Sequence, residues 1–213
     1  MAPRIRPDFS FEILAFEQGA ARVVGVDEVG RGPLAGPVMA AAVRLHPDHI
    51  PDGLADSKML THHRRDVLFE AIMHSSEVGI GRAEVGEIDE INILQATFLA
   101  MQRAIAALPD PPDHLLIDGK LLPRGLNCPA QGLIKGDARS LSIAAASIVA
   151  KVTRDRLMVD LAQQFPGYGW EKNAGYPTKA HLNALQNLGV TPHHRRSFRP
   201  VHKMLYQEVY ISP

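Results

Sequence analysis

Residues 23–43 read VVGVDEVGRGPLAGPVMAAAV and constrain the fold more than any other part of the chain. One apolar run ends in two adjacent acids, Asp27 and Glu28, and a second apolar run follows a turn rich in glycine and proline. Continuous apolar runs bounded by turn residues indicate buried strands. Because the connection is short, the pattern predicts an antiparallel hairpin with strands at about 22–28 and 37–45. The acids then lie at the edge of a sheet.

These two acids admit two interpretations. Burying ionised carboxylates costs free energy unless a positive charge pairs with them, and Mg2+ binds through a few carboxylates together with water and substrate phosphates. Gly30 and Gly32 allow a backbone to approach a ligand closely, and Arg31 between them has the length to reach a phosphate. The pattern therefore favours a site for a metal and a phosphate. The alternative is a hairpin turn whose acids are solvated.

The charge of the chain is balanced overall but unevenly distributed. Residues 1–120 carry 11 Lys and Arg against 18 Asp and Glu, a net charge of −7, and residues 121–213 carry 12 against 5, a net charge of +7. Such asymmetry between halves points to a nucleic-acid surface. An acidic half able to bind metal beside a basic half suits a nuclease, and chance segregation is the alternative.

Several features favour a cytoplasmic protein. The single Cys128 excludes an internal disulfide framework and fits a reducing compartment. No apolar stretch approaches the roughly 20 residues that a membrane helix needs. The first residues, MAPRIRPDFSFE, lack the apolar segment of a signal peptide.

The remainder of the chain alternates predicted helices and strands. The clearest helix covers 87–108, where apolar residues recur at steps of three and four and Pro109 ends the pattern. The other expected elements are a helix from its N-cap Thr61 to about Met73, strands at 78–84, 114–118 and, more weakly, 131–134, a long helix at 142–165, a loop at 166–177, and a helix from Thr178 to Leu188 that Gly189 terminates. This alternation favours an α/β sandwich with a mixed sheet. Because no linker divides the chain, we expect one domain over 1–213.

Two further acids occupy positions like those of Asp27 and Glu28. Asp118 ends the predicted strand 114–118, and Asp137 lies just before the long helix. Strand ends and helix starts converge at one edge of an α/β sheet. Three or four acids gathered there would build a two-metal site for in-line phosphodiester displacement, and their mutual repulsion makes sense only if cations fill the site. Alone, Asp118 fits an ordinary turn residue and Asp137 an ordinary helix cap.

Six segments, in chain order, resemble motifs of one family. They are DEVGRGPLAGPV at 27–38, DSKML at 56–60, LLIDG at 115–119, KGDARSLSIAAASIVAKVTRD at 135–155, GYPTKAHLNAL at 175–185 and HHRRSF at 193–198. On these segments the chain resembles bacterial ribonuclease HII, from about Val23 to Val201. One such motif would be weak evidence of a relationship, but six in the same order make the resemblance specific.

The resemblance implies a ribonuclease H-like fold, with an α/β mixed sheet flanked by helices over about 20–165 and a C-terminal helical extension over about 166–213. It implies an endoribonuclease that cleaves the RNA strand of RNA–DNA hybrids. It also implies incision on the 5′ side of single ribonucleotides embedded in duplex DNA, leaving 3′-hydroxyl and 5′-phosphate ends. The expected cofactor is Mg2+ or Mn2+, with two ions when substrate is bound. We expect a monomer that binds hybrid or ribonucleotide-containing duplex and no membrane.

The resemblance also implies roles for individual residues. The metal-binding and catalytic acids are expected to be Asp27, Glu28, Asp118 and Asp137. The GRG segment that contacts the backbone and the 2′-hydroxyl at the RNA–DNA junction is expected to be Gly30, Arg31 and Gly32. The tyrosine that stacks on the neighbouring sugar is expected to be Tyr176.

The chemistry of these residues agrees with such roles. Only the 2′-hydroxyl separates RNA from DNA at a given site, and glycine-flanked backbone groups can approach it where a Cβ would collide. An aromatic face packs well on a deoxyribose. For Tyr176, packing in the core or a loop is the alternative.

Several polar residues suit contacts with phosphate: Ser57 and Lys58, Lys151 and Arg154 on the long helix, and the basic run at 193–196. The basic run would contact a nucleic-acid backbone through counterion release. The alternatives are a solvated face or packing against the core. His181 is expected to be structural rather than a ligand.

One departure from the family pattern concerns Asn173 and Ala174. Many relatives have a His-Lys pair just before the Gly-Tyr of the GYPT segment, so this chain lacks one cation there. Because the acids are untouched, we expect affinity rather than chemistry to differ.

Three other functions remain open at this point. A ribonuclease HIII-type enzyme would favour runs of ribonucleotides over a single one. The support for a nucleotide-binding module is weak, because GRGPLAG lacks the GK[ST] ending and does not open a helix. A non-catalytic hybrid-binding protein is disfavoured by the presence of all four acids.

Overall fold

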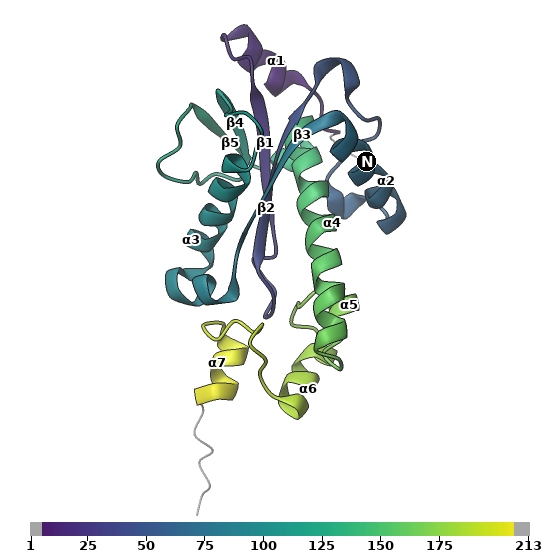
Figure 1. Ribbon diagram of the computed structural model, residues 1–213, viewed down its shortest axis with the longest axis vertical. Helices are drawn as coiled ribbons and strands as arrows, with labels where there is room; N and C mark the ends of the chain where they lie inside the picture. Colours follow the sequence, from purple (N-terminus) through teal and green to yellow (C-terminus); the bar gives the residue numbers. More distant parts are fainter. Residues whose placement is uncertain (1–5, 207–213) are drawn as a thin grey trace, which may run out of the picture.

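The computed structural model describes residues 6–206, which form a five-stranded sheet flanked by helices (Figure 1). The spatial order of the strands is β3-β2-β1-β4-β5. The strands are β1 (Val23–Val29), β2 (Val38–Leu45), β3 (Ser76–Ala83), β4 (His114–Asp118) and β5 (Ala130–Leu133). All five strands that the sequence predicts are therefore present, with bounds shifted by one or two residues.

The sheet is mixed, as expected. β1 pairs antiparallel with β2, with Asp27 opposite Ala41, which confirms the predicted hairpin. On its other side β1 pairs parallel with β4, with Val26 opposite Ile117. Because the two parallel strands end at the same edge, Asp118 lies beside the end of β1.

Seven helices accompany the sheet within the described residues. They are α1 (Ser10–Glu17), α2 (His62–Ser75), α3 (Val85–Ala106), α4 (Leu141–Gln164), α5 (Trp170–Asn173), α6 (Lys179–Leu188) and α7 (Arg199–Tyr206). α3 packs on the face that presents Val24 and Val26, and α2 and α4 pack on the opposite face with Ala41 and Val43. Figure 1 shows α5, α6 and α7 gathered beyond the turn between β1 and β2. No helix in residues 6–206 combines the length and apolar character needed to cross a membrane.

The long helix α4 lies directly against β1. A Cβ on Gly25 would stand 2.2 Å from the backbone carbon of Ser142, so only glycine permits this approach. The small residues Ala144 to Ala146 of the same helix are fully buried. This close packing brings the start of α4, and the turn before it, to the edge where β1 delivers its acids.

Helix caps confirm several expected boundaries. Thr61 Oγ1 accepts a hydrogen bond from the Arg64 N–H, and Thr178 Oγ1 accepts one from the His181 N–H. At the start of α4 the cap is Ser140, whose Oγ accepts from the Ile143 N–H. Asp137 therefore does not cap this helix, and its carboxylate is left for another role.

Two elements differ from the prediction. α3 begins at Val85, and Asn92 inside it has φ +68°, a left-handed conformation that kinks the helix. The Asn92 side chain accepts hydrogen bonds from the N–H groups of Leu94 and Gln95, which restarts the helix after the kink. The segment 166–177, expected to be loop, contains the short helix α5.

Candidate active site

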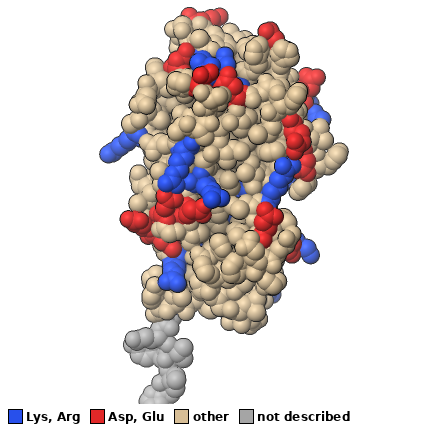
Figure 2. All heavy atoms as spheres, viewed as in Figure 1, with Lys and Arg blue, Asp and Glu red and all other residues tan. Residues whose placement is uncertain are grey.

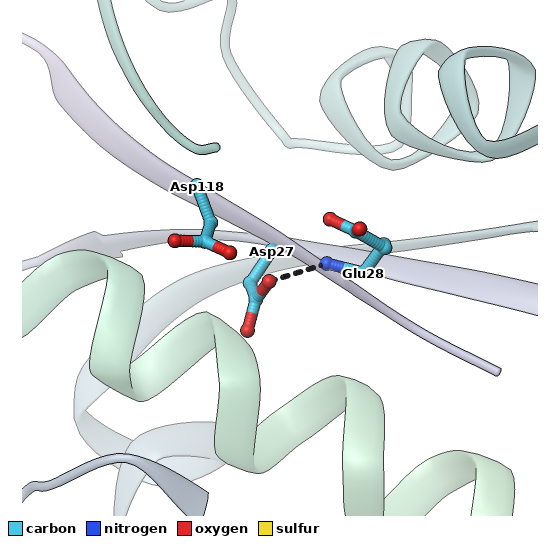
Figure 3. A group of neighbouring side chains, drawn as sticks. All are labelled: Asp27, Glu28 and Asp118. Carbon is cyan, nitrogen blue, oxygen red and sulfur yellow. Dashed lines mark hydrogen bonds between the residues drawn. The ribbon is translucent and has the colours of Figure 1, made fainter. Parts of the chain in front are cut away.

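Three acids meet at the edge of the sheet (Figure 3). Asp27 and Glu28 lie near the end of β1, and Asp118 is the last residue of β4. Each offers one carboxylate oxygen to a group whose atoms all lie within 4.8 Å of one another. Asp27 is only 5% exposed, and its Oδ1 accepts a hydrogen bond of 2.8 Å from the Glu28 N–H. The convergence expected from the two strand ends is therefore present.

Asp137 borders this group without belonging to it. It lies in the 3-10 turn η3 (Gly136–Ala138), and the Gly136 N–H donates to Asp118 Oδ1 at 2.7 Å, which ties the turn to the end of β4. Asp137 Oδ2 instead pairs with Lys58 Nζ at 3.3 Å. The fourth expected acid is thus beside the cluster, with a lysine as its partner.

Burial and like charge raise the pKa values of these acids. The pKa of Asp27 lies well above its usual range, chiefly because of burial and then because of the charges of Glu28, Asp118 and Asp137. Burial also raises the pKa of Glu28, against the opposing effect of Arg31, whose Nη1 lies 3.1 Å from Glu28 Oε1. A cluster of carboxylates that repel each other in this way favours the binding of a cation.

The donor set fits a hard divalent cation. All the converging atoms are carboxylate oxygens, which Mg2+ and Mn2+ prefer. In addition, Glu28 Oε2 is buried and has no hydrogen-bond partner among the described residues. Buried polar atoms are nearly always paired, so this oxygen lacks the partner that a bound cation would supply.

Ser57 and Lys58 lie on one short turn, η2 (Ser57–Met59), beside the acids. Ser57 is buried, and its N–H donates to Ser147 Oγ of α4. The Lys58 side chain is 77% exposed and lies between Asp56 and Asp137, with Nζ 3.7 Å and 3.3 Å from their oxygens. Of the two, Lys58 is therefore the one whose charge reaches the open side of the site.

The GRG segment and Tyr176 come together from distant parts of the chain. Gly30 has φ +91°, a conformation that favours glycine. A Cβ on Gly32 would stand 3.4 Å from the Tyr176 ring, and the ring is 42% exposed. The Leu34 N–H donates to the carbonyl of Gly175 at 2.7 Å and holds the two segments together. The ring is thus presented to solvent next to the segment.

At Arg154 and in part of the basic run, the structure shows buried side chains, which excludes a phosphate contact there. Arg154 is fully buried, and its guanidinium donates only to backbone carbonyls. In the basic run 193–196, His194 and Arg195 are also buried, so they cannot contact a nucleic-acid backbone. Lys151, the other candidate on α4, forms an ion pair of 2.7 Å with Asp155.

The prediction that His181 is structural is confirmed. Its Nε2 accepts from the Trp170 indole N–H at 3.0 Å, and its Nδ1 lies 2.9 Å from the carbonyl of Tyr176. Asn173 also has a structural role, because its side chain donates to the Tyr168 carbonyl and accepts from the Gly175 N–H. Both residues support the loop that carries Tyr176.

One face of the molecule shows no segregation of positive from negative side chains (Figure 2). On the face drawn in Figure 2, Lys and Arg alternate with Asp and Glu instead of forming one basic patch. Arg154 and Arg195, both in the basic half of the sequence, are buried and add no charge to the surface. The Lys58–Asp137 pair was not expected from the sequence, although both residues lie in the segments 56–60 and 135–155 that resemble the family.

Comparisons with known proteins agree with the geometry. Residues 24–208 match the family model described as Ribonuclease HII. The chain is 66% identical over 203 residues to a Ribonuclease HII of Ruegeria pomeroyi, covering 95% of this chain and 87% of that protein. It is 63% identical over 207 residues to one of Cereibacter sphaeroides, covering 97% and 98%. A crystal structure of ribonuclease H2 from Pyrococcus horikoshii superposes with a TM-score of 0.72 at 28% identity, covering 86% of this chain and 97% of the other. The expected ribonuclease H-like fold is thereby confirmed.

Proposed function

The chain belongs to the ribonuclease HII family and is an endoribonuclease acting on RNA–DNA hybrids, and from this premise we propose that it also incises duplex DNA at single ribonucleotides. The cut falls on the 5′ side of the ribonucleotide and leaves 3′-hydroxyl and 5′-phosphate ends. The observation that carries the proposal is that two features adjoin: the cluster of acids, and a glycine segment that begins two residues after Glu28 and lies beside Tyr176.

Enzymes of the ribonuclease H type use divalent metal ions, and the acidic cluster offers the place for them. We propose that Asp27, Glu28 and Asp118 hold one ion, and that Asp137 with the cluster holds a second when substrate is bound. Either Mg2+ or Mn2+ suits these oxygens. Such ions, when bound, supply an activated water and stabilise the leaving oxygen of an in-line displacement. The carboxylates fix the position of that chemistry at the end of β1.

Lys58 lies next to Asp137, where a metal ion held by Asp137 would also lie. Its exposed ammonium offsets the charge of Asp137 in the metal-free protein. We propose that Lys58 turns to a substrate phosphate when the site fills, with Ser57 holding the turn against α4. Arg31 is in a similar position, because its pairing with Glu28 is half exposed and a phosphate can compete for it.

Recognition of the ribonucleotide falls to Gly30, Arg31, Gly32 and Tyr176. Backbone groups of the glycine segment reach the 2′-hydroxyl, which alone distinguishes RNA from DNA there. The exposed face of Tyr176 stacks on the neighbouring sugar. A Cβ on Gly32 would stand 3.4 Å from this ring, so the segment that reads the hydroxyl and the ring that stacks on the sugar are neighbours.

The proposal extends to the assembly of the enzyme. All the residues named above come from one chain, so no second copy is needed to complete the site, and we propose a cytoplasmic monomer. We also propose that the core and the C-terminal extension act as one domain, because the extension supplies Tyr176. Light scattering coupled to size exclusion tests the monomer, and a dimeric mass would contradict it.

The test is cleavage of three duplexes with and without Mg2+: one with a single ribonucleotide in DNA, one with a long RNA–DNA hybrid, and one of DNA alone. We expect metal-dependent cleavage of the first two and none of the third. Cleavage of the long hybrid without incision at the single ribonucleotide would contradict the proposal and favour the preference of a ribonuclease HIII-type enzyme. Product ends are identified by ligation, which requires a 3′-hydroxyl and a 5′-phosphate.

A further inference from the structure

Two arginines are buried without a carboxylate partner. Arg154 of α4 and Arg195, which follows α6, are both 0% exposed. In the described part of the chain, neither forms a salt bridge; their donors go to backbone carbonyls. Buried charges are normally paired, so two cations kept in neutral surroundings require a reason. The reason lies in the segment that their guanidiniums hold.

Arg195 binds the backbone of the GRG segment. Its three nitrogens donate to three carbonyl oxygens of the loop between β1 and β2: Nε to Gly36 at 2.9 Å, Nη1 to Arg31 at 3.0 Å and Nη2 to Gly30 at 2.6 Å. The backbone adds to this grip, since the Arg195 N–H donates to the Leu34 carbonyl at 2.8 Å. One planar side chain thus fixes both ends of the loop.

Arg154 holds the same loop and joins it to the segment before Tyr176. Its Nε and Nη2 donate to Pro37 and Ala35 of the loop, each at 3.0 Å. Its Nη1 donates at 2.9 Å to the carbonyl of Ala174, two residues before Tyr176. Ala174 itself has φ +47°, an uncommon conformation for a residue with a side chain. The guanidinium therefore bridges the two parts expected to contact the RNA–DNA junction.

The glycines of the loop leave room for these guanidiniums. A Cβ on Gly30 would stand 2.3 Å from Arg154 Nε and 2.7 Å from Cδ. Hence Gly30 is needed as much for the packing of Arg154 beneath it as for its own conformation. The loop and the two arginines fit together as one unit.

We propose that Arg195 and Arg154 are positioning residues that set the specificity of this enzyme for a single embedded ribonucleotide. They hold loop 30–37 and Tyr176 at a fixed spacing, so that one group reads the 2′-hydroxyl while the other stacks on the next sugar. This inference rests on the proposed function. A long hybrid offers a 2′-hydroxyl at every position and so tolerates a looser loop, whereas a single ribonucleotide offers one register only.

The chemistry of arginine explains why no other residue suits these positions. A guanidinium presents five donors in a rigid plane, which matches several carbonyls at once, and a lysine is a point charge that does not. Burial lowers the pKa of Arg195 to about 9 and that of Arg154 to about 10, so both stay charged at neutral pH. Two positive charges therefore remain beneath a loop that faces an anionic substrate.

The test compares Arg195→Lys and Arg154→Lys with the control Arg156→Lys. Arg156 lies on α4 two residues from Arg154, but it is half exposed and pairs with Glu70 at the surface. Single-turnover rates are measured on the single-ribonucleotide duplex and on the long hybrid, together with the melting temperature. Because a charge-assisted hydrogen bond is lost at the loop, we expect about a tenfold loss on the single ribonucleotide. The rate on the long hybrid, and both rates of the control Arg156→Lys, should change much less.

Chemical rescue separates positioning from simple stability. Added guanidinium ion should restore part of the single-ribonucleotide rate of Arg195→Ala, and ammonium at the same concentration should not. Equal losses on both substrates, in step with the fall in melting temperature, would overturn the inference. So would a single-ribonucleotide rate unchanged in both lysine variants. If the unsubstituted protein cuts the long hybrid but not the single ribonucleotide, the proposed function itself fails.

Discussion

Asp27→Asn is predicted to abolish cleavage and yet to stabilise the metal-free protein. Asparagine keeps the Oδ1 that accepts from the Glu28 N–H at 2.8 Å, so local structure survives the change. What it removes is a charge that is 95% buried among other acids. Because the pKa of Asp27 is raised, the metal-free protein loses stability as the pH rises from the usual aspartate range through that raised value. The substitution removes this loss.

The size of the gain follows from the spacing of the acids. For two unit charges at 4.8 Å, Coulomb's law with an effective dielectric constant of about 20 gives about 3 kcal/mol. Each carboxylate spreads its charge over two oxygens, so we expect a gain in unfolding free energy of about 1–3 kcal/mol at pH 7.5. For a chain of this length each kcal/mol raises the melting temperature by about 2–4 °C.

Two assays check this prediction. Melting temperatures are measured in EDTA and in Mg2+ for the unsubstituted protein and for Asp27→Asn. Saturating Mg2+ at about 100 times its Kd should add about 2.7 kcal/mol to the unsubstituted protein and less to the variant. Cleavage should fall about 10³-fold or more, since metal stabilisation of the transition state amounts to several kcal/mol. Lower stability of the variant in EDTA, or equal stabilisation of both proteins by Mg2+, would refute the reasoning.

Three further predictions concern the rest of the structure. Tyr176→Ala should reduce incision at a single ribonucleotide about tenfold or more, as expected for a lost stacking contact. The melting temperature should change little, because Tyr176 is 42% exposed. Comparable losses of incision and of thermal stability would place Tyr176 in the core. Gly30→Ala should destabilise the protein more than Gly19→Ala in urea unfolding. Both glycines have positive φ, but a Cβ on Gly30 would stand 2.3 Å from Arg154 Nε, whereas one on Gly19 would meet nothing within 4 Å; equal effects would exclude the clash. Burial lowers the pKa of His194 to about 4, so between pH 6.5 and 4 the unfolded chain binds a proton that the folded chain does not, and unfolding free energy should fall by about 3 kcal/mol as the pH drops. In urea titrations across that range His194→Asn should show a flatter profile, and an unchanged slope would contradict the assignment.

Local patterns were sufficient to predict the hairpin, the helix caps and the strand that ends in Asp118. Each depends on neighbours in sequence: apolar runs, turn residues, or a hydroxyl three residues before its N–H partner. The meeting of Asp118 with Asp27 was also predictable, since parallel strands end at the same edge of a sheet.

The roles of Arg154 and Arg195 were not predictable in the same way. Their partners are carbonyls 117 and 165 residues away, and carbonyls leave no mark in a sequence. A basic run looks the same whether its charges face solvent or a loop. The kink at Asn92 could not be predicted either, because the apolar repeat of the helix continues across it. The Asn92 side chain accepts the hydrogen bond that restarts the helix after the kink.

The most direct test of the account is the position of bound metal. Crystals grown with Mn2+ and a duplex carrying one ribonucleotide would give an anomalous difference map that identifies each ion. We predict one peak among the oxygens of Asp27, Glu28 and Asp118, and a second beside Asp137 with Lys58 displaced from it. Peaks elsewhere, or an empty acidic cluster in crystals that contain Mn2+, would contradict the claim that these acids form the metal centre.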